Sequence, residues 1–230
     1  MKSNFLLKNI KNAIVFGAGH GIGFSLFKLL HDSCPNTNLI GTYRLENKAE
    51  ALIELCKGED HLNCYYFDPL ANESKLPFEL SEDLSPNLVL NSIGILSPSG
   101  LSPEKSLRNI NLDQLKEVFA VNTFITPLLL SEIKPFVKRD QDFVFASLSA
   151  MVGSITDNRL GGWYSYRASK SALNMFIKTA ALEFKNSGFH KSSIMAIHPG
   201  TTETELSKAF LKSVKHKIWQ PDEAAANILS

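Results

Sequence analysis

Short apolar runs alternate with helical patterns along nearly the whole chain, and this alternation restricts the fold more than any other feature. The first apolar run, NAIVF, ends in the glycine-rich turn GAGHGIG at 17–23, and apolar residues at helical spacing follow the turn. Strands that alternate with helices form a parallel sheet with helices on both faces. We therefore predict an α/β fold, a Rossmann-type doubly wound parallel sheet, built as a single domain over residues 1–230.

The same unit recurs further along the chain. A long helical pattern starts near Asn111, and Pro127 should kink or break it because proline has no amide hydrogen. An alanine-rich helical pattern begins near Tyr166 and ends at Gly188, a residue type favoured just after helices. Further strands are expected at 38–43, 62–67, 87–94, 142–149 and 192–200.

The composition and charge are those of an ordinary globular protein. The chain has 230 residues, 44% of them hydrophobic and 20% charged, and its formal net charge is +1. A charge so close to zero gives no reason to expect a nucleic acid or a membrane as partner. The three cysteines, Cys34, Cys56 and Cys64, cannot all pair and show no CxxC spacing, so we expect free thiols, a reducing compartment and no metal.

The N-terminal segment does not have the pattern of a signal peptide. Lys8 and Lys11 interrupt its apolar stretch, and no small-residue cleavage site follows. No apolar run approaches the roughly 18 residues that are needed to span a bilayer. We therefore expect a cytoplasmic protein.

The glycines of the first turn follow the spacing GxxxGxG, at Gly17, Gly21 and Gly23. Such a turn brings backbone N–H groups against a diphosphate at the N-terminus of a helix, where a side chain would block the approach. The position of the turn, between the first strand and a long helix, favours a dinucleotide site that also includes His20 and Ile22. A tight turn without a ligand is the alternative.

The end of the second predicted strand bears on which dinucleotide binds. NAD-binding folds commonly place a carboxylate there, whereas this chain has Thr42, Tyr43 and Arg44. An arginine can hold a 2′-phosphate, so we predict NADP (as NADPH) in preference to NAD. Glu46 lies close enough to keep NAD as an alternative, and Arg44 as a solvated surface residue is another.

Several motifs resemble those of the short-chain dehydrogenase/reductase family across nearly the whole chain. Each motif alone is weak evidence for the family, but their joint occurrence in the expected order is specific to it. The segment GSITDNRLGGWYSYRASKSALN at 153–174 further resembles the branch that contains bacterial C-factor signalling proteins and insect sniffer-type carbonyl reductases. The motifs are the GxxxGxG turn, Asp68 after the third strand, NSIG at 91–94, Asn122 in the long helix, Tyr166-x-x-x-Lys170 and PGTTET at 199–204.

Tyr166 and Lys170 stand four residues apart, so on a helix they share one face. An ammonium near a tyrosine stabilises the phenolate and lowers its pKa from about 10, which suits proton transfer. The resemblance implies that Tyr166 protonates a carbonyl oxygen while nicotinamide delivers hydride, that Lys170 holds the nicotinamide ribose, and that Asn122 holds a water of the proton relay. Tyr164 is a competitor, but it lies six residues from Lys170 and faces elsewhere on the helix.

The resemblance also implies further cofactor contacts and a state of assembly. Family members assemble through the helices around Asn122 and Tyr166, so we expect a homodimer or homotetramer that acts on a small-molecule carbonyl or alcohol. Further cofactor-binding residues are expected at Asp68, Asn91, Gly94, Pro199, Gly200, Thr201 and Thr204.

One catalytic position departs from the family pattern. The family usually has a serine pair after the fifth strand, three and four residues before a glycine, and its second serine binds the substrate carbonyl. Counting back from Gly153, that position is Ala150 and the first serine is Ser149. We expect Ser149 to supply the hydroxyl within hydrogen-bond reach of the catalytic tyrosine; the alternative is that Ser149 points away and Ala150 lines the pocket. The first placement requires the chain to leave strand geometry by about Ser147, because adjacent side chains on a strand face opposite ways. Ser147 and Ser154 are less favoured substitutes.

The C-terminal segment bears on the fold, and the intact tyrosine–lysine pair bears on the activity. The residues QPDEAAANILS indicate the start of a helix, and we expect the fold to lack the usual seventh strand, as a domain truncated at its C-terminus would. We predict an NADP(H)-dependent oxidoreductase that reduces a carbonyl to an alcohol, or catalyses the reverse. The alternative, which Ala150 and the short C-terminus favour slightly, is a dinucleotide-binding signalling or redox-sensing protein with little turnover.

Overall fold

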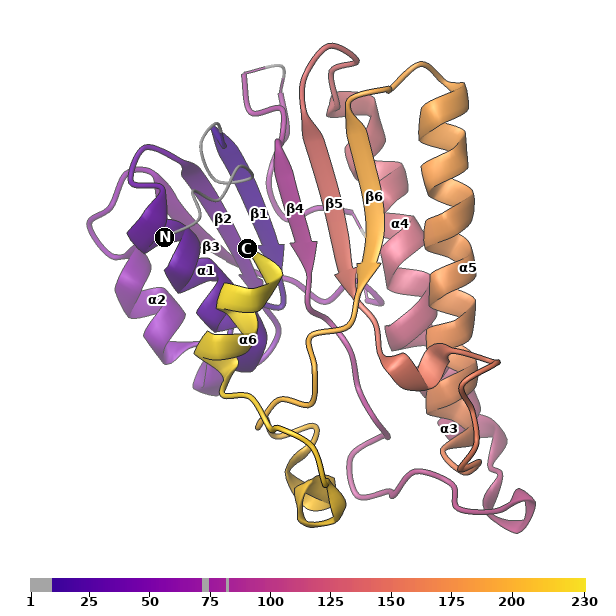
Figure 1. The fold of residues 1–230 in the computed structure, drawn as a ribbon. Coiled ribbons are helices and arrows are strands. Elements are labelled where there is room, and N and C mark those ends of the chain that lie inside the picture. Colours follow the sequence, from indigo (N-terminus) through magenta and orange to yellow (C-terminus); the bar gives the residue numbers. More distant parts are fainter. Residues whose placement is uncertain (1–9, 72–74, 82) are drawn as a thin grey trace.

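Six parallel strands form one sheet in the order β3-β2-β1-β4-β5-β6 (Figure 1). The computed structural model describes residues 10–71, 75–81 and 83–230, so Lys8 and the start of the N-terminal segment lie outside the described residues. The predicted doubly wound α/β fold is confirmed, and within the described ranges the sheet has no seventh strand. The strands are β1 (Asn12–Phe16), β2 (Asn38–Tyr43), β3 (Leu62–Tyr66), β4 (Leu88–Asn91), β5 (Phe143–Leu148) and β6 (Ser192–Ile197).

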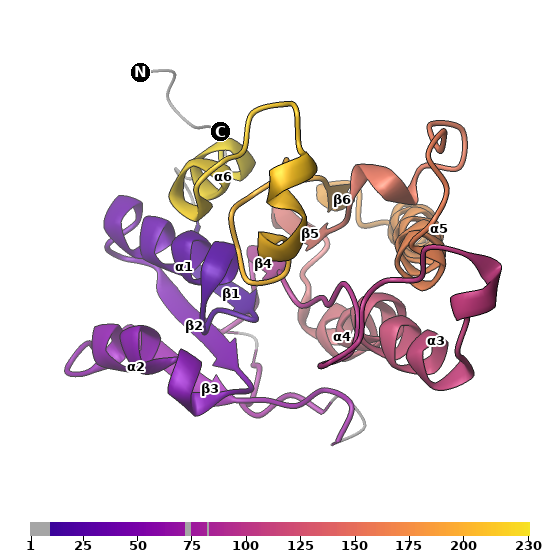
Figure 2. The same cartoon turned by 90° about the horizontal axis from the view of Figure 1, so that it is seen from below.

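Helices cover both faces of this sheet, as Figures 1 and 2 show. On one face lie α1 (Gly21–Ser33), α2 (Glu50–Cys56) and α6 (Pro221–Ile228). On the side of the other face lie α3 (Leu112–Phe119), α4 (Ile125–Ile133) and α5 (Tyr164–Asn186). None of the helices in the described part of the chain is both long enough and apolar enough to cross a membrane.

The first strand shows how one apolar run stabilises both layers. Ala13 and Val15 pack in a core cluster with residues of α1, α2 and α6. Ile14 and Phe16 pack in a second cluster with residues of α4 and α5. Successive side chains of a strand point to opposite faces, so a continuous apolar run is what a sheet that is buried on both faces requires.

The long helical pattern around Pro127 is interrupted, as predicted. A π-helical turn, Ala120–Phe124, separates α3 from α4 and carries the buried side chain of Asn122. Pro127 lies in the first turn of α4 and has no amide hydrogen to donate to the carbonyl of Thr123 in the π turn. The α-helical bonding is therefore interrupted at the π turn and resumes in α4. Such π turns often occur at functional sites.

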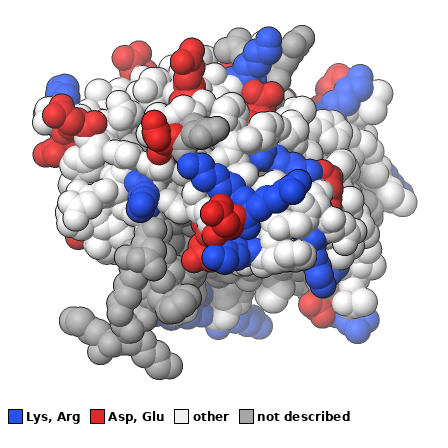
Figure 3. Space-filling view, turned by 90° about the horizontal axis from the view of Figure 1, so that it is seen from above, with Lys and Arg blue, Asp and Glu red and all other residues white. Residues whose placement is uncertain are grey.

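The strands run parallel, so their carboxyl ends meet at one edge of the sheet, which Figure 2 shows from below. The opposite edge, seen in Figure 3, carries Lys and Arg side chains beside Asp and Glu side chains. The described residues on that face therefore present no extended surface of a single charge. Short 3-10 helices follow several strands or helices: η2 (Glu46–Lys48), η3 (Leu107–Asn109), η5 (Lys134–Phe136), η6 (Met151–Gly153) and η7 (Lys208–Ser213).

Candidate active site

The glycine-rich turn between β1 and α1 depends on its glycines for two different reasons. Gly17 and Gly21 have φ of +78° and +58°, a backbone conformation that side chains with a Cβ rarely adopt. Gly23 has no such φ, but a Cβ there would lie 2.1 Å from the Gly17 carbonyl oxygen and 2.4 Å from Ser92 Oγ. The third glycine therefore allows α1 to pack closely against the turn, and the unpaired amides of the first turn of α1 remain at the sheet edge.

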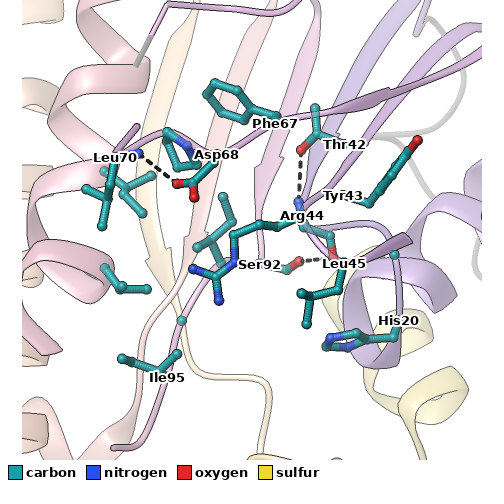
Figure 4. A pocket seen from close by; sticks show the side chains of 17 residues that line it. His20, Thr42, Tyr43, Arg44, Leu45, Phe67, Asp68, Leu70, Ser92 and Ile95 are labelled. Carbon is teal, nitrogen blue, oxygen red and sulfur yellow. Dashed lines mark hydrogen bonds between the residues drawn. The ribbon is translucent and has the colours of Figure 1, made fainter. Parts of the chain in front are cut away.

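A cleft opens beside this turn at the carboxyl ends of the strands (Figure 4). It lies where the strand order reverses between β1 and β4, the place where doubly wound sheets bind ligands. The cleft brings together residues from the ends of β1, β2, β3 and β4. Of the predicted cofactor residues, Gly17, His20, Arg44, Asp68 and Gly94 line the cleft.

Two polar residues that the sequence analysis did not assign hold the turn in place. Thr42 Oγ1 accepts a hydrogen bond of 3.2 Å from the Gly17 amide. Ser92 Oγ donates to the carbonyl oxygens of Phe16 (2.8 Å) and Gly17 (3.1 Å). Both residues line the cleft. Their place in the sequence could have indicated this role, since each is a small hydroxyl residue at the carboxyl end of a predicted strand.

Arg44 reaches from the end of β2 into the cleft (Figure 4). It is exposed, and among the described residues no carboxylate forms an ion pair with it, so its charge is available to an anionic ligand. Asp68, which follows β3, accepts a hydrogen bond of 3.1 Å from the Leu70 amide. Glu46, the carboxylate that kept NAD as an alternative, lies in η2 and is not among the residues that line the cleft.

An ion pair bridges two segments at the glycine turn. Lys48, at the end of η2, pairs with Glu205, which lies 157 residues further along the chain. His20 lies close to both, and its burial, followed by the Lys48 ammonium, lowers the pKa of this histidine. The segment after β6 is therefore tied to the segment after β2.

The segment after β6 holds four further predicted cofactor residues, and they do not line the cleft. Gly200 has φ of +78°, and a Cβ there would lie 2.6 Å from Cδ1 of Trp219. Thr201 Oγ1 hydrogen-bonds His216 Nε2 at 2.8 Å. The methyl carbon of Thr204 would lie 3.6 Å from a Cβ on Gly21, so this residue lies beside the glycine turn. Pro199 precedes this group directly after β6.

The predicted tyrosine and lysine both lie on the buried face of α5. Tyr166 is 8% exposed and Lys170 is 4% exposed, whereas the competing Tyr164 is 36% exposed. Lys170 Nζ donates to the Leu148 carbonyl at 2.8 Å and lies 5.9 Å from the centre of the Tyr166 ring. A Cβ on Gly94 would lie 3.5 Å from that nitrogen, so the end of β4 and the start of α5 meet at this point.

Burial dominates the protonation of both residues. It raises the pKa of Tyr166 to about 12 and lowers the pKa of Lys170 to about 8 because both charged forms are poorly solvated. The expectation that the ammonium lowers the pKa of Tyr166 is therefore not met in this structure, where the desolvation of the phenolate outweighs the attraction. Near neutral pH the tyrosine keeps its proton and can serve as a proton donor.

Asn122 joins the π turn, the end of β4 and α5. Its Nδ2 donates to the Ile95 carbonyl at 2.8 Å and to Ser169 Oγ at 3.2 Å. Its Oδ1 accepts from the Ile95 amide at 2.8 Å. A Cβ on Gly94 would lie 3.3 Å from this oxygen, so Asn122 and Gly94 are neighbours. The partner Ser169 was missed by the sequence analysis, although it stands directly before Lys170.

Asn91, another predicted cofactor residue, is buried beneath the cleft. Its Nδ2 donates to Thr126 Oγ1 at 3.0 Å and to Ser147 Oγ at 3.3 Å. Its Oδ1 accepts from the Ile93 amide at 3.1 Å, which shapes the turn after β4. In this structure Asn91 therefore supports the cleft from below and is not among the residues that line it.

Ser149 is held away from the position in which it was expected. Its hydroxyl donates to Asn174 Oδ1 on α5 at 2.7 Å, and within the described ranges no hydrogen bond joins it to Tyr166. The reason is that β5 continues through Leu148 instead of ending by about Ser147. The next residue, Ala150, is half-buried and precedes η6.

The two less favoured serines have other partners as well. Ser147 Oγ lies 3.1 Å from Thr126 Oγ1, and Ser154 Oγ lies 3.3 Å from Thr156 Oγ1. In the described part of the chain, none of the serines considered for the carbonyl-binding role hydrogen-bonds the tyrosine.

Known proteins resemble this chain over most of its length. The family model described as short chain dehydrogenase matches residues 11–215. The 1-hydroxy-2-glutathionyl-2-methyl-3-butene dehydrogenase of Rhodococcus sp. (strain AD45) is 24% identical over 223 residues, which are 96% of this chain and 89% of the relative. C-signal of Myxococcus xanthus is 26% identical over 101 residues, which are 44% of this chain and 59% of the relative.

Solved structures share the fold. Carbonyl reductase Sniffer of D. melanogaster superposes with a TM-score of 0.77 at 20% identity, over 96% of this chain and 90% of the other. The NADPH-bound carbonyl reductase from chicken fatty liver gives 0.77 at 21% identity, over 96% and 86%. The predicted resemblance, including that to C-factor and sniffer-type proteins, is thus confirmed. Because the family model spans most of its length, the chain belongs to the short-chain dehydrogenase family of oxidoreductases.

Proposed function

We propose that this protein is an NADP(H)-dependent oxidoreductase that reduces a carbonyl to an alcohol, or catalyses the reverse. The observation that carries the proposal is the meeting of Lys170 and Asn122 at Gly94, a residue that lines the cleft, with Lys170 Nζ 5.9 Å from the centre of the Tyr166 ring. A buried proton donor next to a dinucleotide-type cleft is the arrangement that hydride transfer to a carbonyl needs.

The residues of the cleft fit a nicotinamide dinucleotide. The glycine-rich turn at Gly17–Gly23 and the first amides of α1 suit a diphosphate. Asp68, after β3, and Gly94, after β4, line the same cleft. Thr204 lies beside the glycine turn. In our proposal these residues hold the cofactor together with Ile22 and Asn91, and with the segment from Pro199 to Thr201. When bound, the reduced nicotinamide supplies the hydride.

The preference for NADP over NAD is proposed from Arg44. Its guanidinium reaches into the cleft from the end of β2, where a 2′-phosphate of the adenine ribose would lie. Among the described residues, no carboxylate lines the cleft at that strand end. The chicken fatty liver carbonyl reductase, which shares the fold, is described as NADPH-bound.

The protein side of the reaction is a proton transfer from Tyr166. Its hydroxyl retains its proton at neutral pH and donates it to the carbonyl oxygen as that oxygen gains negative charge. Lys170, anchored on the Leu148 carbonyl, places an ammonium beside the ring and stabilises the phenolate that remains. Asn122 hydrogen-bonds both Ile95, after β4, and Ser169 on α5, and in our proposal this link holds the proton donor in place beside the cleft.

A second candidate is a dinucleotide-binding signalling or redox-sensing protein with little turnover. The observation that favours it is the hydrogen bond from Ser149 to Asn174. Ala150, which stands at the position of the usual carbonyl-binding serine, has no hydroxyl to replace it. Loss of one such donor typically costs about two to three orders of magnitude in kcat. The rate of turnover therefore separates the two candidates.

We also propose a small-molecule substrate and a homodimer or homotetramer. Apolar side chains are exposed on α3, the π turn, α4 and α5, and such a surface favours contact with another protein chain. Light scattering of the purified protein tests the assembly. The exposed residues are Leu112, Phe124, Leu128, Met175, Phe176 and Leu182.

The experiment that tests the proposed function measures binding and turnover together. Dissociation constants for NADPH and NADH are measured by fluorescence titration, and NADPH oxidation is followed with a panel of aldehydes, ketones and diketones. We expect tighter binding of NADPH and measurable oxidation with at least one carbonyl compound. Binding of NADPH without oxidation by any member of the panel would favour the sensing protein, and failure to bind either dinucleotide would reject both.

A further inference from the structure

The N-terminus of α5, which carries Tyr166, has no capping side chain of its own. The N-cap residue is Trp163, whose φ of +53° and ψ of +47° are left-handed, and its side chain makes no capping hydrogen bond. A bulky residue rarely adopts this conformation, which persists only where the surroundings fix it. Gly161 and Gly162, just before it, also have positive φ values of +63° and +65°.

Glu104 supplies the missing cap from a distant loop. It lies in the segment 95–111 after β4, and it is 1% exposed. Its backbone carbonyl accepts a hydrogen bond of 2.5 Å from the Trp163 amide, and its carboxylate Oε2 accepts one of 3.2 Å from the Ser165 amide. Ser165 is the second residue of α5, and its amide is one that an N-cap side chain normally binds. The two contacts fix the left-handed turn and the first turn of the helix together.

The burial of this carboxylate is costly and is only partly compensated. Among the described residues no Lys or Arg forms an ion pair with Glu104, and its second oxygen, Oε1, is buried without a hydrogen-bond partner. The hydroxyl of Ser165 is also buried, and it too has no hydrogen-bond partner in the described part of the chain. The positive end of the α5 dipole favours the charge, but buried polar groups without partners are rare and call for an explanation. Violations of such rules in natural proteins are expected at functional or strained sites.

What the cap holds in place is the proton donor. Tyr166 directly follows Ser165, and the Trp163 ring packs edge-on against the Tyr166 ring with a centroid distance of 6.1 Å. The same indole packs against Phe210 of η7 at 5.0 Å. A shift of the first turn of α5 would therefore move the Tyr166 hydroxyl and the aromatic ring beside it.

We propose that Glu104 is a positioning residue, which fixes the left-handed turn at Trp163 and the first turn of α5 so that the Tyr166 hydroxyl is aligned with the reacting carbonyl. This proposal rests on the proposed function, since it concerns the same proton transfer. It adds a residue to which neither the family motifs nor the lining of the cleft assigns a role.

The test compares two substitutions of Glu104 with a matched control. Glu104→Met removes the acceptor but keeps the length of the side chain, whereas Glu104→Gln keeps an oxygen for the Ser165 amide. Gln114→Met is the control, because Gln114 Nε2 ties the same loop through the Ser102 carbonyl at 3.2 Å, and among the described residues its side chain makes no hydrogen bond to α5. We expect Glu104→Met to lower kcat on the order of 10- to 100-fold, since misplacement by about 1 Å has this effect. We expect Glu104→Gln and Gln114→Met to stay within about threefold of the parent, with the NADPH dissociation constant unchanged in all three.

A spectroscopic measurement reports the turn independently of activity. The chain has two tryptophans, so a Trp219→Phe background leaves Trp163 as the only source of indole fluorescence. We expect its emission maximum to shift in Glu104→Met and to stay unchanged in Glu104→Gln and Gln114→Met. If Glu104→Met does not fold, Glu104→Asp withdraws the carboxylate by one methylene group and carries the same expectation.

Two results would overturn the proposal. One is a folded Glu104→Met variant with kcat and Trp163 emission like those of the parent. The other is a Gln114→Met variant that loses as much kcat as Glu104→Met, which would show a general effect of loosening the loop. Either result would leave the proposed function intact if Tyr166→Phe abolishes turnover, whereas full turnover of Tyr166→Phe would reject the proposed function itself.

Discussion

Substitution of Gly23 tests the requirement for close packing at the glycine turn. In Gly23→Ala the added Cβ would lie 2.1 Å from the Gly17 carbonyl oxygen, 2.4 Å from Ser92 Oγ and 2.9 Å from the Gly17 carbonyl carbon. Backbone atoms cannot turn aside as a flexible side chain can, so α1 has to move away from the turn. Overpacking of this kind typically costs about 1–3 kcal/mol, and we expect the upper end, about 3 kcal/mol, because two of the three contacts are with backbone atoms.

Gly58→Ala is the matched control for this substitution. Gly58 has a φ of +77°, and apart from its chain neighbours no atom of the described residues lies within 4 Å of its Cβ position. The change therefore introduces only backbone strain, about 1–2 kcal/mol for a left-handed residue, at a position remote from the cleft. We expect its affinity for NADPH to equal that of the parent.

The assay combines urea unfolding, followed by far-ultraviolet circular dichroism, with fluorescence titration of NADPH. We expect Gly23→Ala to lose more unfolding free energy than Gly58→Ala and to bind NADPH at least about tenfold more weakly, since a tenfold change corresponds to only about 1.4 kcal/mol. A Gly23→Ala protein whose stability and NADPH affinity match those of the parent would refute the packing argument.

Three further predictions concern the charge, the buried lysine and the displaced serine. Arg44→Ala should weaken NADPH binding and leave NADH binding nearly unchanged, as measured by titration of both; equal losses for the two would contradict the assignment. The pKa of Lys170 is about 8 when folded and about 10.4 in an unfolded chain, so Lys170 holds a proton longer in the unfolded chain and its contribution to the unfolding free energy should rise with pH between these values, by up to roughly 3 kcal/mol. The raised pKa values of Cys34, Cys56 and Cys64 act in the opposite sense in both proteins, so urea unfolding at pH 8 and pH 10 should show an unfolding free energy that rises more, or falls less, in the parent than in Lys170→Met. Ser149→Ala should change turnover little, because its hydroxyl is bound to Asn174, whereas Ala150→Ser should raise it; the opposite pattern in steady-state rates would restore Ser149 to the catalytic role.

The features predicted correctly from the sequence are those that depend on a pattern of residues close together in the chain. Apolar runs such as NAIVF mark strands that are buried on both faces, and the glycine spacing from Gly17 to Gly23 marks the turn that follows. The absence of an amide hydrogen at Pro127 indicates the break that the structure shows as a π turn. The helix face that carries Tyr166 and Lys170 follows from their spacing, and both side chains are buried.

The features that the sequence did not predict depend on partners far along the chain. Ser149 is bound by Asn174, 25 residues away, and α5 is capped by Glu104, whose partner Ser165 lies 61 residues further on. Neither contact has a periodicity or spacing that a single sequence reveals. The raised pKa of Tyr166 is a further example, because it arises from burial by the folded chain and not from the neighbouring lysine.

The measurement that tests the central claim most directly is the activity of Tyr166→Phe beside that of Tyr164→Phe. Both variants remove one hydroxyl from the first turn of α5, but Tyr166 is 8% exposed and Tyr164 is 36% exposed. We expect Tyr166→Phe to lower NADPH oxidation with a carbonyl substrate by about 10²- to 10⁴-fold, the usual contribution of a proton donor, while its NADPH dissociation constant stays near that of the parent. Tyr164→Phe should retain activity. Turnover retained by Tyr166→Phe, or lost in Tyr164→Phe instead, would contradict the account.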